Sequence, residues 1–442
     1  MTELALREPG KVSMYVCGPT VYDVPHIGHG RFTLVWDVLR RYLEWRGYEV
    51  HYVSNITDIE DKIIRRASQD GISTDEVVRT YEKAWWDAMD RLGVMHPDEE
   101  PHATAYVDQM VDYIAGLIDR GVAYQTSDGV YFEVAKLPGY GLLARQSLES
   151  LRAGAGDREL VGEAEKRSPL DFALWKVAKP GEPEWPSPWG AGRPGWHIEC
   201  TVMSLDLLGA GFDLHGGGND LTFPHHENER AQALGAGHEF ARCWVHSGMV
   251  VAEGGEKMSK SLNNFVSLTD LLEKVDGRAY RLLVLQSHYR SPLQVTETNL
   301  DAATSALASL DAFARRFAHV APAPALPTAL DEFAALMDDD FKTPGATRVI
   351  FNLVTDANKA ADDGDGDAAK ASAATALELL RAVGLDLRNE IGEVPPEVTA
   401  LAEARNVARA EKNWAEADRL RDELQALGWT VGDGPTGTVV HR

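Results

Sequence analysis

Cysteine is scarce in this sequence. Three cysteines, Cys17, Cys200 and Cys243, stand far apart among 442 residues. An odd number of widely spaced cysteines excludes a closed disulfide framework and fits a reducing compartment, so we expect a cytoplasmic protein. Metal binding or simple burial then accounts for these thiols better than cross-linking does, and we interpret Cys243 as a buried free thiol.

Long apolar runs and positive charge are scarce as well. No run reaches the roughly 18 apolar residues of a membrane span, and the opening MTELALREPGKV lacks the apolar core of an export signal. We therefore expect no membrane partner. The 44 Lys and Arg against 68 Asp and Glu leave a net charge of −24, which argues against indiscriminate nucleic-acid binding. A local basic face on an acidic body is compatible with that total.

The chain opens with the pattern of an α/β fold class. Residues 11–18 (KVSMYVCG) are apolar and β-branched and end before a proline, which is typical of a buried strand and a turn. An apolar stripe at helical spacing runs from Phe32 to Leu43, and residues 49–56 are typical of the next strand. Strand, helix and parallel strand predict a doubly wound, Rossmann-type parallel sheet, whose ligands bind at the carboxyl ends of the strands.

Later changes in pattern divide the chain into further parts, and 442 residues predict two to four domains. A hairpin pattern and a Pro/Trp-rich stretch interrupt the sheet, and the chain beyond Ser261 is mostly helical. Asn413 then begins a helix that precedes a hairpin around a Gly-Pro turn. The predicted parts are a catalytic domain at 1–114 and 191–255, an insertion at 115–190, a loop with helices at 256–320, a helical domain at 328–390 and a small helix-and-hairpin module at 399–442.

Two histidines, His26 and His29, stand three residues apart at the predicted start of the first helix. They would lie beside unpaired backbone N–H groups and the positive end of the helix dipole, an arrangement suited to a triphosphate. Gly28 and Gly30 would let a nucleotide approach the backbone closely. The alternative is a pair of ordinary surface imidazoles near a helix start, and this spacing alone does not separate the two interpretations.

A second charged motif is GGEKMSKSLNNF at 254–265. Lys257 and Lys260 lie three residues apart between a glycine pair and polar residues, which suggests a mobile loop that carries positive charge. Lys260 could neutralise the charge that builds on a departing pyrophosphate. Taken alone, such a KxxK pattern is more often a solvated turn between a strand and a helix.

A third group of residues has the chemistry of a zinc site. Cys17, Cys200 and the FPHHENE cluster at 223–229 supply two thiols, imidazoles and carboxylates. His225 and Glu229 stand four residues apart, so a helix would place them on one face. The HHENE spacing differs from the HExxH of metalloproteases, which argues against peptide hydrolysis.

Together, HIGH after the first strand and KMSKS late in the α/β pattern resemble the two signatures of class I aminoacyl-tRNA synthetases. Further stretches resemble the cysteinyl-tRNA synthetase family, in order and across most of the chain. They are MYVCGPTVYDVPHIGHGR, NITDIEDKI, SPLDFALWK, RPGWHIEC, DLHGGGNDLTFPHHENE, HSGM and KMSKS. Small departures exist: Glu60 stands where that family often has Asp, and LNN follows the lysine motif in place of LGN.

The resemblance implies roles for individual residues and for substrates. It implies L-cysteine, ATP with Mg²⁺ and tRNA(Cys) as substrates, one zinc ion per chain, a monomer, stem-contact helices in 256–320 and an anticodon-binding module in 399–442. It places His26, His29, Lys257 and Lys260 in catalysis, and Gly28 with His26, His29 and Lys260 at ATP. It places Gly18, Thr57 and Trp196 at the amino acid. The implied zinc ligands are Cys17, Cys200, His225 and Glu229.

Zinc would explain how the amino acid is selected. Cysteine and serine differ by one atom, and a pocket that reads only shape separates such near-isosteres by roughly 10²-fold. Zinc binds a thiolate strongly and an alcohol poorly, so a metal–sulfur contact can supply the missing discrimination. We therefore expect no hydrolytic editing domain.

Two other functions stay open from the sequence alone. A cysteine ligase for an aminosugar of the mycothiol pathway would share the activation and zinc chemistry but would need no anticodon reader. A non-catalytic RNA-binding or regulatory relative would be expected to lose the ATP signatures, which are intact here. The tail favours tRNA, because cations and a tryptophan suit the reading of single-stranded bases, although a solvated helical face also fits. These residues are Arg405, Arg409, Lys412, Trp414, Arg419 and Arg421.

Overall fold

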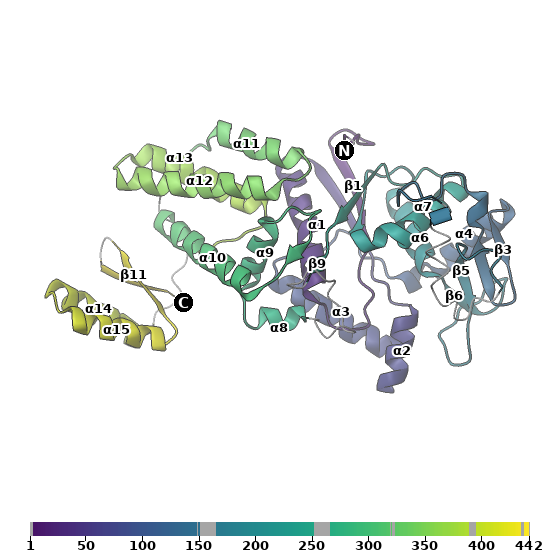
Figure 1. The fold of residues 1–442 in the computed structure, drawn as a ribbon, viewed down its shortest axis with the longest axis horizontal. Coiled ribbons are helices and arrows are strands. Elements are labelled where there is room, and N and C mark those ends of the chain that lie inside the picture. The colour runs from purple at the N-terminus through teal and green to yellow at the C-terminus, as the bar shows by residue number, and fades with distance from the viewer. Residues whose placement is uncertain are drawn as a thin grey trace.

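The computed structural model describes residues 3–147, 149–150, 165–251, 266–318, 320, 323–388, 395–434 and 437–441. The predicted loop that carries Lys257 and Lys260 lies outside these residues. Figure 1 shows an antiparallel sheet at one end of the long axis, the C-terminal module at the other end and a parallel sheet between them. None of the described helices is both long enough and apolar enough to cross a membrane.

The central sheet has four parallel strands in the order β2-β1-β7-β8. Both strands that the sequence predicted at the start of the chain are confirmed. All four carboxyl ends lie at the same edge, because every neighbouring pair is parallel. The strands are β1 (Lys11–Val16), β2 (Glu49–Ser54), β7 (Leu214–Gly218) and β8 (Cys243–Ser247).

The free thiol of Cys243 begins the edge strand β8. It is only partly buried, which corrects the expectation of a buried thiol.

Helices cover both faces of this sheet. Met14 and Val16 of β1 pack with Trp36 of α1 (Ile27–Trp45). Tyr15, which lies between them, packs in a different cluster with residues of α6 (Trp196–Leu208). Because side chains alternate across a strand, the two faces of β1 bury different helices. This is the doubly wound arrangement that the sequence predicted.

An antiparallel sheet of order β3-β4-β5-β6 is inserted between β2 and β7 in the chain. Its first two strands form the hairpin that the sequence predicted. A side chain at Gly129 would place its Cβ 2.1 Å from the carbonyl oxygen of Trp175, so this close pairing requires glycine. The strands are β3 (Ala123–Gln125), β4 (Gly129–Phe132), β5 (Phe172–Val177) and β6 (Gly192–Pro194).

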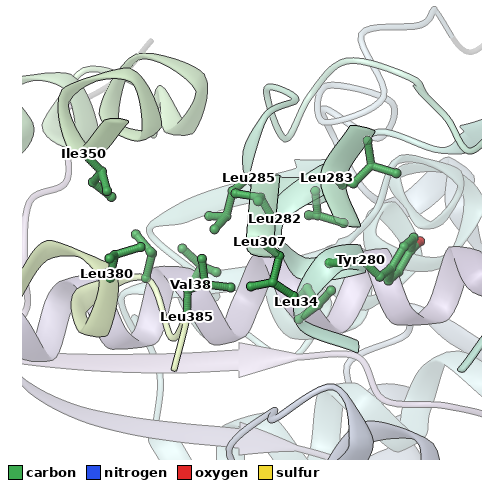
Figure 2. Packing of buried hydrophobic residues seen from close by; sticks show 14 of the residues in the cluster. Leu34, Val38, Tyr280, Leu282, Leu283, Leu285, Leu307, Ile350, Leu380 and Leu385 are labelled. Carbon is green, nitrogen blue, oxygen red and sulfur yellow. The ribbon is translucent and has the colours of Figure 1, made fainter. Parts of the chain in front are cut away.

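The helices that follow the sheet share one core with α1. Figure 2 shows Leu34 and Val38 of α1 with Leu285, Leu307 and Leu380 from later helices. Burying each such leucine contributes about 1.5–3 kcal/mol, so these helices are held firmly against α1. They are α8 (Leu268–Leu272), α9 (Gly277–Leu285), α10 (Glu297–Phe317), α11 (Pro327–Asp338), α12 (Thr343–Asp362) and α13 (Gly366–Ala382).

The C-terminal module has a core of its own, in which Val398, Leu424 and Val440 pack together. The side chain of Asn413 accepts a hydrogen bond from the backbone N–H of Glu416 at 3.4 Å, which confirms the predicted helix start. The predicted hairpin is also present and antiparallel. The elements are α14 (Pro396–Ala410), α15 (Trp414–Ala426), β11 (Thr430–Gly434) and β12 (Gly437–His441).

Further elements connect these parts, and two of them, the strands β9 and β10, pair in parallel with each other. The remaining elements are α2 (Asp61–Asp70), α3 (Thr74–Arg91), α4 (Val107–Asp119), α7 (Glu227–Gly235), β9 (Val250–Val251) and β10 (Leu293–Gln294), with short helical turns at Ala103–Tyr106, Val134–Lys136, Asn219–Leu221 and Thr222–His226.

Candidate active site

A cavity of about 320 Å³ opens at the carboxyl edge of the parallel sheet. Thr57 does not line it, because this side chain is only 1% exposed. Sequence reasoning gave no role to Lys62 and Asp220, which also line the cavity, although both stand in stretches that carry the resemblance. The predicted site residues that line it are Cys17, Gly18, His26, Gly28, His29 and Trp196.

His26 and His29 cap the start of α1 reciprocally. The backbone N–H of His29 donates to His26 Nδ1 at 3.1 Å, and the backbone N–H of His26 donates to His29 Nδ1 at 3.2 Å. The two rings stack with their centroids 3.6 Å apart. Because each Nδ1 accepts a hydrogen bond, the neutral tautomer of each ring carries its proton on Nε2. Burial, with the charges of His26 and Lys62, lowers the pKa of His29 well below its ordinary value, so His29 is a neutral donor.

The glycines around these histidines serve different purposes. A Cβ at Gly28 would lie 2.9 Å from the ring of His26, so glycine allows the two imidazoles to stack. A Cβ at Gly30 would instead meet Leu268 at 3.0 Å and Tyr280 at 3.2 Å. Gly30 therefore packs against α8 and α9, which corrects the expectation that it makes room for a nucleotide.

Four predicted ligands, Cys17, Cys200, His225 and Glu229, lie together in buried positions, and one donor atom from each lies within 4.8 Å of the others. Glu229 Oε1 lies 3.6 Å from Cys17 Sγ and 3.2 Å from His225 Nε2. That His225 nitrogen is buried and makes no hydrogen bond with any residue of the described chain. Burial raises the pKa of the Cys17 thiol and lowers that of the His225 imidazole. Two sulfurs, a nitrogen and an oxygen around one point form a donor set suited to a metal ion.

Further histidines surround this cluster, and sequence reasoning gave none of them an individual role. His215 Nε2 lies 2.8 Å from Glu229 Oε2, and His226 Nε2 lies 3.4 Å from Cys17 Sγ. His246 Nε2 lies 2.8 Å from the other ring nitrogen of His226. Cys17, His215, His226 and Glu229 thus form a second set of close donor atoms. A histidine inside the glycine-rich strand β7 was the one signal that could have identified His215.

Asn55, directly after β2, joins the amino-acid side of the cavity to the ligand cluster. Its Oδ1 accepts the Gly18 backbone N–H at 2.9 Å and lies 3.6 Å from Cys200 Sγ. Its Nδ2 donates to Thr57 Oγ1 at 3.2 Å, and Thr57 donates to Glu199 Oε2 at 3.2 Å. Burial raises the pKa of Glu199 well above its ordinary value. Thr57 is therefore held from two sides although it does not line the cavity.

The predicted lysine loop leaves and rejoins the described chain at the cavity. Val250, shortly before residues 252–265, and Val266, directly after them, both line the cavity. The carbonyl of Val266 accepts the backbone N–H of Ile27 at 3.2 Å, immediately after His26. Lys257 and Lys260 themselves lie outside the described residues, so their predicted roles stay predictions.

The cations predicted for RNA binding differ in their surroundings. Arg405 is 6% exposed and donates to Thr438 Oγ1 at 2.8 Å, so it supports the packing of the C-terminal module instead of lying on a basic face. Arg419 is paired with two glutamates on its own helix. Trp414 is 60% exposed and offers a large aromatic surface to solvent.

Three families match successive parts of the sequence. Residues 3–305 match the tRNA synthetases class I (C) catalytic domain. Residues 332–387 match the DALR domain, and residues 392–440 match the cysteinyl-tRNA ligase anticodon binding domain. The matches follow the order of the parts seen in the structure.

Curated relatives are similar along nearly the whole chain. The cysteine–tRNA ligase of Pseudomonas aeruginosa strain LESB58 is 49% identical over 439 residues, which cover 97% of this chain and 94% of the relative. The cysteine–tRNA ligase of Sodalis glossinidius is 47% identical over 447 residues, which cover 98% of this chain and 95% of the relative.

Solved structures share the architecture at much lower identity. Mycobacterium tuberculosis methionyl-tRNA synthetase bound by methionyl-adenylate aligns with a TM-score of 0.62 at 16% identity, over 92% of this chain and 96% of that one. The LeuRS–tRNA–LeuAMS ternary complex of Agrobacterium radiobacter K84 aligns with a TM-score of 0.63 at 12% identity, over 87% of this chain and 84% of that one. At these identities the likeness concerns the fold alone.

Proposed function

This chain belongs to the cysteine–tRNA ligase family of class I aminoacyl-tRNA synthetases, and from that premise we propose how its site works. It activates L-cysteine with ATP and transfers the cysteinyl group to tRNA. The observation that carries the mechanism is that a buried cluster of two thiols, an imidazole and a carboxylate adjoins the cavity that His26 and His29 line.

The first step joins cysteine to AMP. A carboxylate oxygen of cysteine attacks the α-phosphorus of ATP, the bond from that phosphorus to the bridging oxygen breaks, and pyrophosphate leaves with the bonding electrons. His26 and His29 donate their Nε2–H groups to the phosphates while negative charge moves onto the leaving group. Mg²⁺ accompanies ATP, and Lys257 and Lys260 add positive charge. Positioning and electrostatics carry the catalysis, without a covalent enzyme intermediate.

The second step esterifies the tRNA. The 2′-hydroxyl of its terminal ribose attacks the carbonyl carbon of cysteinyl-adenylate, the bond from that carbon to the phosphate oxygen breaks, and AMP leaves while the hydroxyl proton passes to solvent. The module predicted at 399–442 would hold the anticodon at the far end of the tRNA. The exposed Trp414 ring suits stacking on an unpaired base.

Zinc is the metal that best fits the four-ligand cluster of Cys17, Cys200, His225 and Glu229. The buried Nε2 of His225 has no hydrogen-bond partner among the described residues, which a metal would supply. When bound, zinc supplies a cation that favours a thiolate and holds sulfur more tightly than an alcohol. His215 contacts Glu229 Oε2 at 2.8 Å and would help to hold that carboxylate as a ligand. Selection against serine then occurs when the substrate binds.

The amino-acid pocket adjoins this cluster, and we assign its wall to Gly18 and Trp196, with Thr57 as a buried support that does not line the cavity. The Trp196 ring centroid lies 4.2 Å from that of His225, so the indole forms a wall directly beside a proposed ligand. The Gly18 backbone and the Thr57 side chain are held in place by Asn55. Gly18 and Trp196 line the same cavity as His26 and His29, so cysteine and ATP would share one cavity.

The decisive experiment offers purified protein, ATP and radiolabelled cysteine to either tRNA or an aminosugar. We expect label in tRNA alone. The aminosugar alternative is not favoured, because residues 392–440 match an anticodon-binding family that such an enzyme has no use for. Label in the aminosugar alone would contradict the proposal, and label in neither acceptor would favour a non-catalytic relative.

Metal analysis tests the zinc assignment separately from activity. We expect about one zinc per chain by elemental analysis, with sulfur and nitrogen in its X-ray absorption spectrum. A metal-free protein that still rejects serine would contradict this assignment. We also propose a cytoplasmic monomer, for which light scattering should give a mass near 48.5 kDa.

A further inference from the structure

Lys62 lies in the first turn of α2 and lines the cavity with His26, His29 and Tyr22. Its Nζ lies 5.3 Å from the centroid of the Tyr22 ring, a distance at which a cation and an aromatic face attract each other. Among the described residues that line the cavity, Lys62 is the only lysine or arginine. Lys62 is therefore the one ammonium or guanidinium group of the described cavity wall, which also holds the carboxylate of Asp220.

Neither acidic neighbour of Lys62 neutralises this charge. Glu60 caps α2, and its Oε2 accepts the backbone N–H of Lys62 at 2.6 Å. The carboxylate of Asp61 pairs with Lys176 Nζ at 3.0 Å and with Arg193. Within the described chain no ion pair of Lys62 with another residue accompanies these contacts. The ammonium group is therefore available to a ligand in the cavity.

The position of Lys62 is unfavourable without an anion. A lysine in the first turn of a helix meets the positive end of the dipole, where acidic residues are preferred. The start of α1, with His26 and His29, brings a second positive helix end to the same cavity. In a chain of net charge −24, this local concentration of positive potential is the arrangement expected of an anion site.

We infer that Lys62 binds a phosphate group of ATP, together with His26 and His29. This inference rests on the proposed function, because ATP is taken as the ligand of the cavity. A lysine ammonium serves as a compact point charge for phosphate. Negative charge grows on the departing pyrophosphate, so a contact there strengthens in the transition state. Phosphates at the 3′ end of tRNA share this chemistry, and the test has to separate the two sources.

The test uses cysteine-dependent ATP–pyrophosphate exchange, which proceeds without tRNA. Lys62→Met removes the charge and keeps a long apolar stem, and Lys62→Arg restores the charge. Arg65→Met is the matched control, because Arg65 is exposed on the same helix and does not line the cavity. We expect Lys62→Met to lower kcat/KM for ATP by about ten- to a hundredfold, as for one charge-assisted hydrogen bond. Lys62→Arg should recover part of the loss, KM for cysteine should hold, and Arg65→Met should behave like the unaltered protein.

Several results would overturn the inference. One is unchanged exchange in Lys62→Met, and another is an equal loss in Arg65→Met. Unchanged exchange with slower transfer from preformed cysteinyl-adenylate would assign Lys62 to a tRNA phosphate and reject ATP. Equal unfolding midpoints would show that the variants are folded. Absence of exchange in the unaltered protein would instead contradict the proposed function, which is a separate outcome.

Discussion

The buried ligand cluster and the C-terminal module hold their polar side chains in opposite ways. At the cluster, His215 and Glu229 are 0% exposed and contact each other. In the module, Arg419 and Glu416 pair on the surface beside the exposed ring of Trp414. A buried polar group left without its partner costs about 1–3 kcal/mol, whereas an exposed ion pair is screened by solvent and contributes much less. The buried cluster is therefore held in one geometry, whereas the exposed side chains of the module can change position at little cost.

The hydrophobic cores of the two regions also differ, because one is large and shared by several parts of the chain and the other is small and separate. The largest core runs from α1 through the helices up to residue 385, so the catalytic domain and the helical domain resist separation. The small core of the module involves only residues between 398 and 440. We therefore expect a substitution in the module to leave cysteine activation intact, and a substitution at the ligand cluster to stop both steps.

The largest expected effect is that of Cys17→Ala. Removing a proposed ligand should lower exchange by more than about 10²-fold, because altering a residue that only orients a ligand already costs roughly 10–100-fold. The matched control is Cys243→Ala, which removes the partly buried thiol of β8 and should leave exchange and zinc content unchanged. Equal activities for the two variants would contradict the separate roles of the two thiols.

His215→Ala should have the next largest effect. His215 contacts Glu229 Oε2 without belonging to the four proposed ligands, so its loss should weaken zinc binding by roughly 10–100-fold. His215→Gln, which keeps a hydrogen-bond donor, should recover part of the affinity. The measurement is competition for zinc with a coloured chelator. Unchanged affinity in both variants would show that Glu229 needs no support from β7.

Trp414→Ala should act on the other region alone. Stacking on one base contributes about 1–3 kcal/mol, so KM for tRNA should rise by at least about fivefold while ATP–pyrophosphate exchange stays unchanged. Aminoacylation of tRNA and ATP–pyrophosphate exchange, both measured on one preparation of the variant, test this expectation. Equal losses in both assays would mean that the module and the cavity are coupled more tightly than their separate cores suggest.

The smallest effects concern pH, and they should have opposite signs for the half-buried Glu100 beside α3 and for the exposed Glu416 of the C-terminal module. Burial raises the pKa of Glu100 from 4.5 to about 7, although Trp86 Nε1 donates to it at 3.1 Å. The folded protein therefore holds this proton more tightly, and stability is lost as pH rises from 4.5 to about 7. Glu100→Gln should raise the unfolding midpoint at pH 8 and change it little at pH 4.

The exposed Glu416 provides the opposite case. Arg419 holds the pKa of Glu416 below its ordinary value of 4.5, so its contribution is present above that pH and is lost on acidification. Glu416→Gln should slightly lower the midpoint at pH 7 and have no effect at pH 3. Thermal unfolding of both variants from pH 3 to pH 8 checks the two signs, and equal signs would contradict the comparison.

Local pattern predicted much of the fold. Strands at the start of the chain, the hairpin after residue 121 and the helix begun by Asn413 all follow from spacing, turn residues and caps. The reciprocal cap between His26 and His29 was not predicted, although their position at a helix start was. Gly30 was misread because a glycine near a nucleotide motif and a glycine under Leu268 look identical in sequence.

The sequence by itself determined the elements, their order and the residue types available for chemistry, because backbone propensity and side-chain spacing act over a few residues. Only the tertiary structure decided which of those residues meet. Parallel strands bring Cys17, Asn55 and His246 to one edge from distant parts of the chain. The tertiary structure also places His215 and His226 beside the proposed ligands, and Lys62 in the cavity wall. It also decided that Arg405 is buried instead of facing RNA. Such contacts depend on packing between elements far apart in the chain, which no short stretch of sequence encodes.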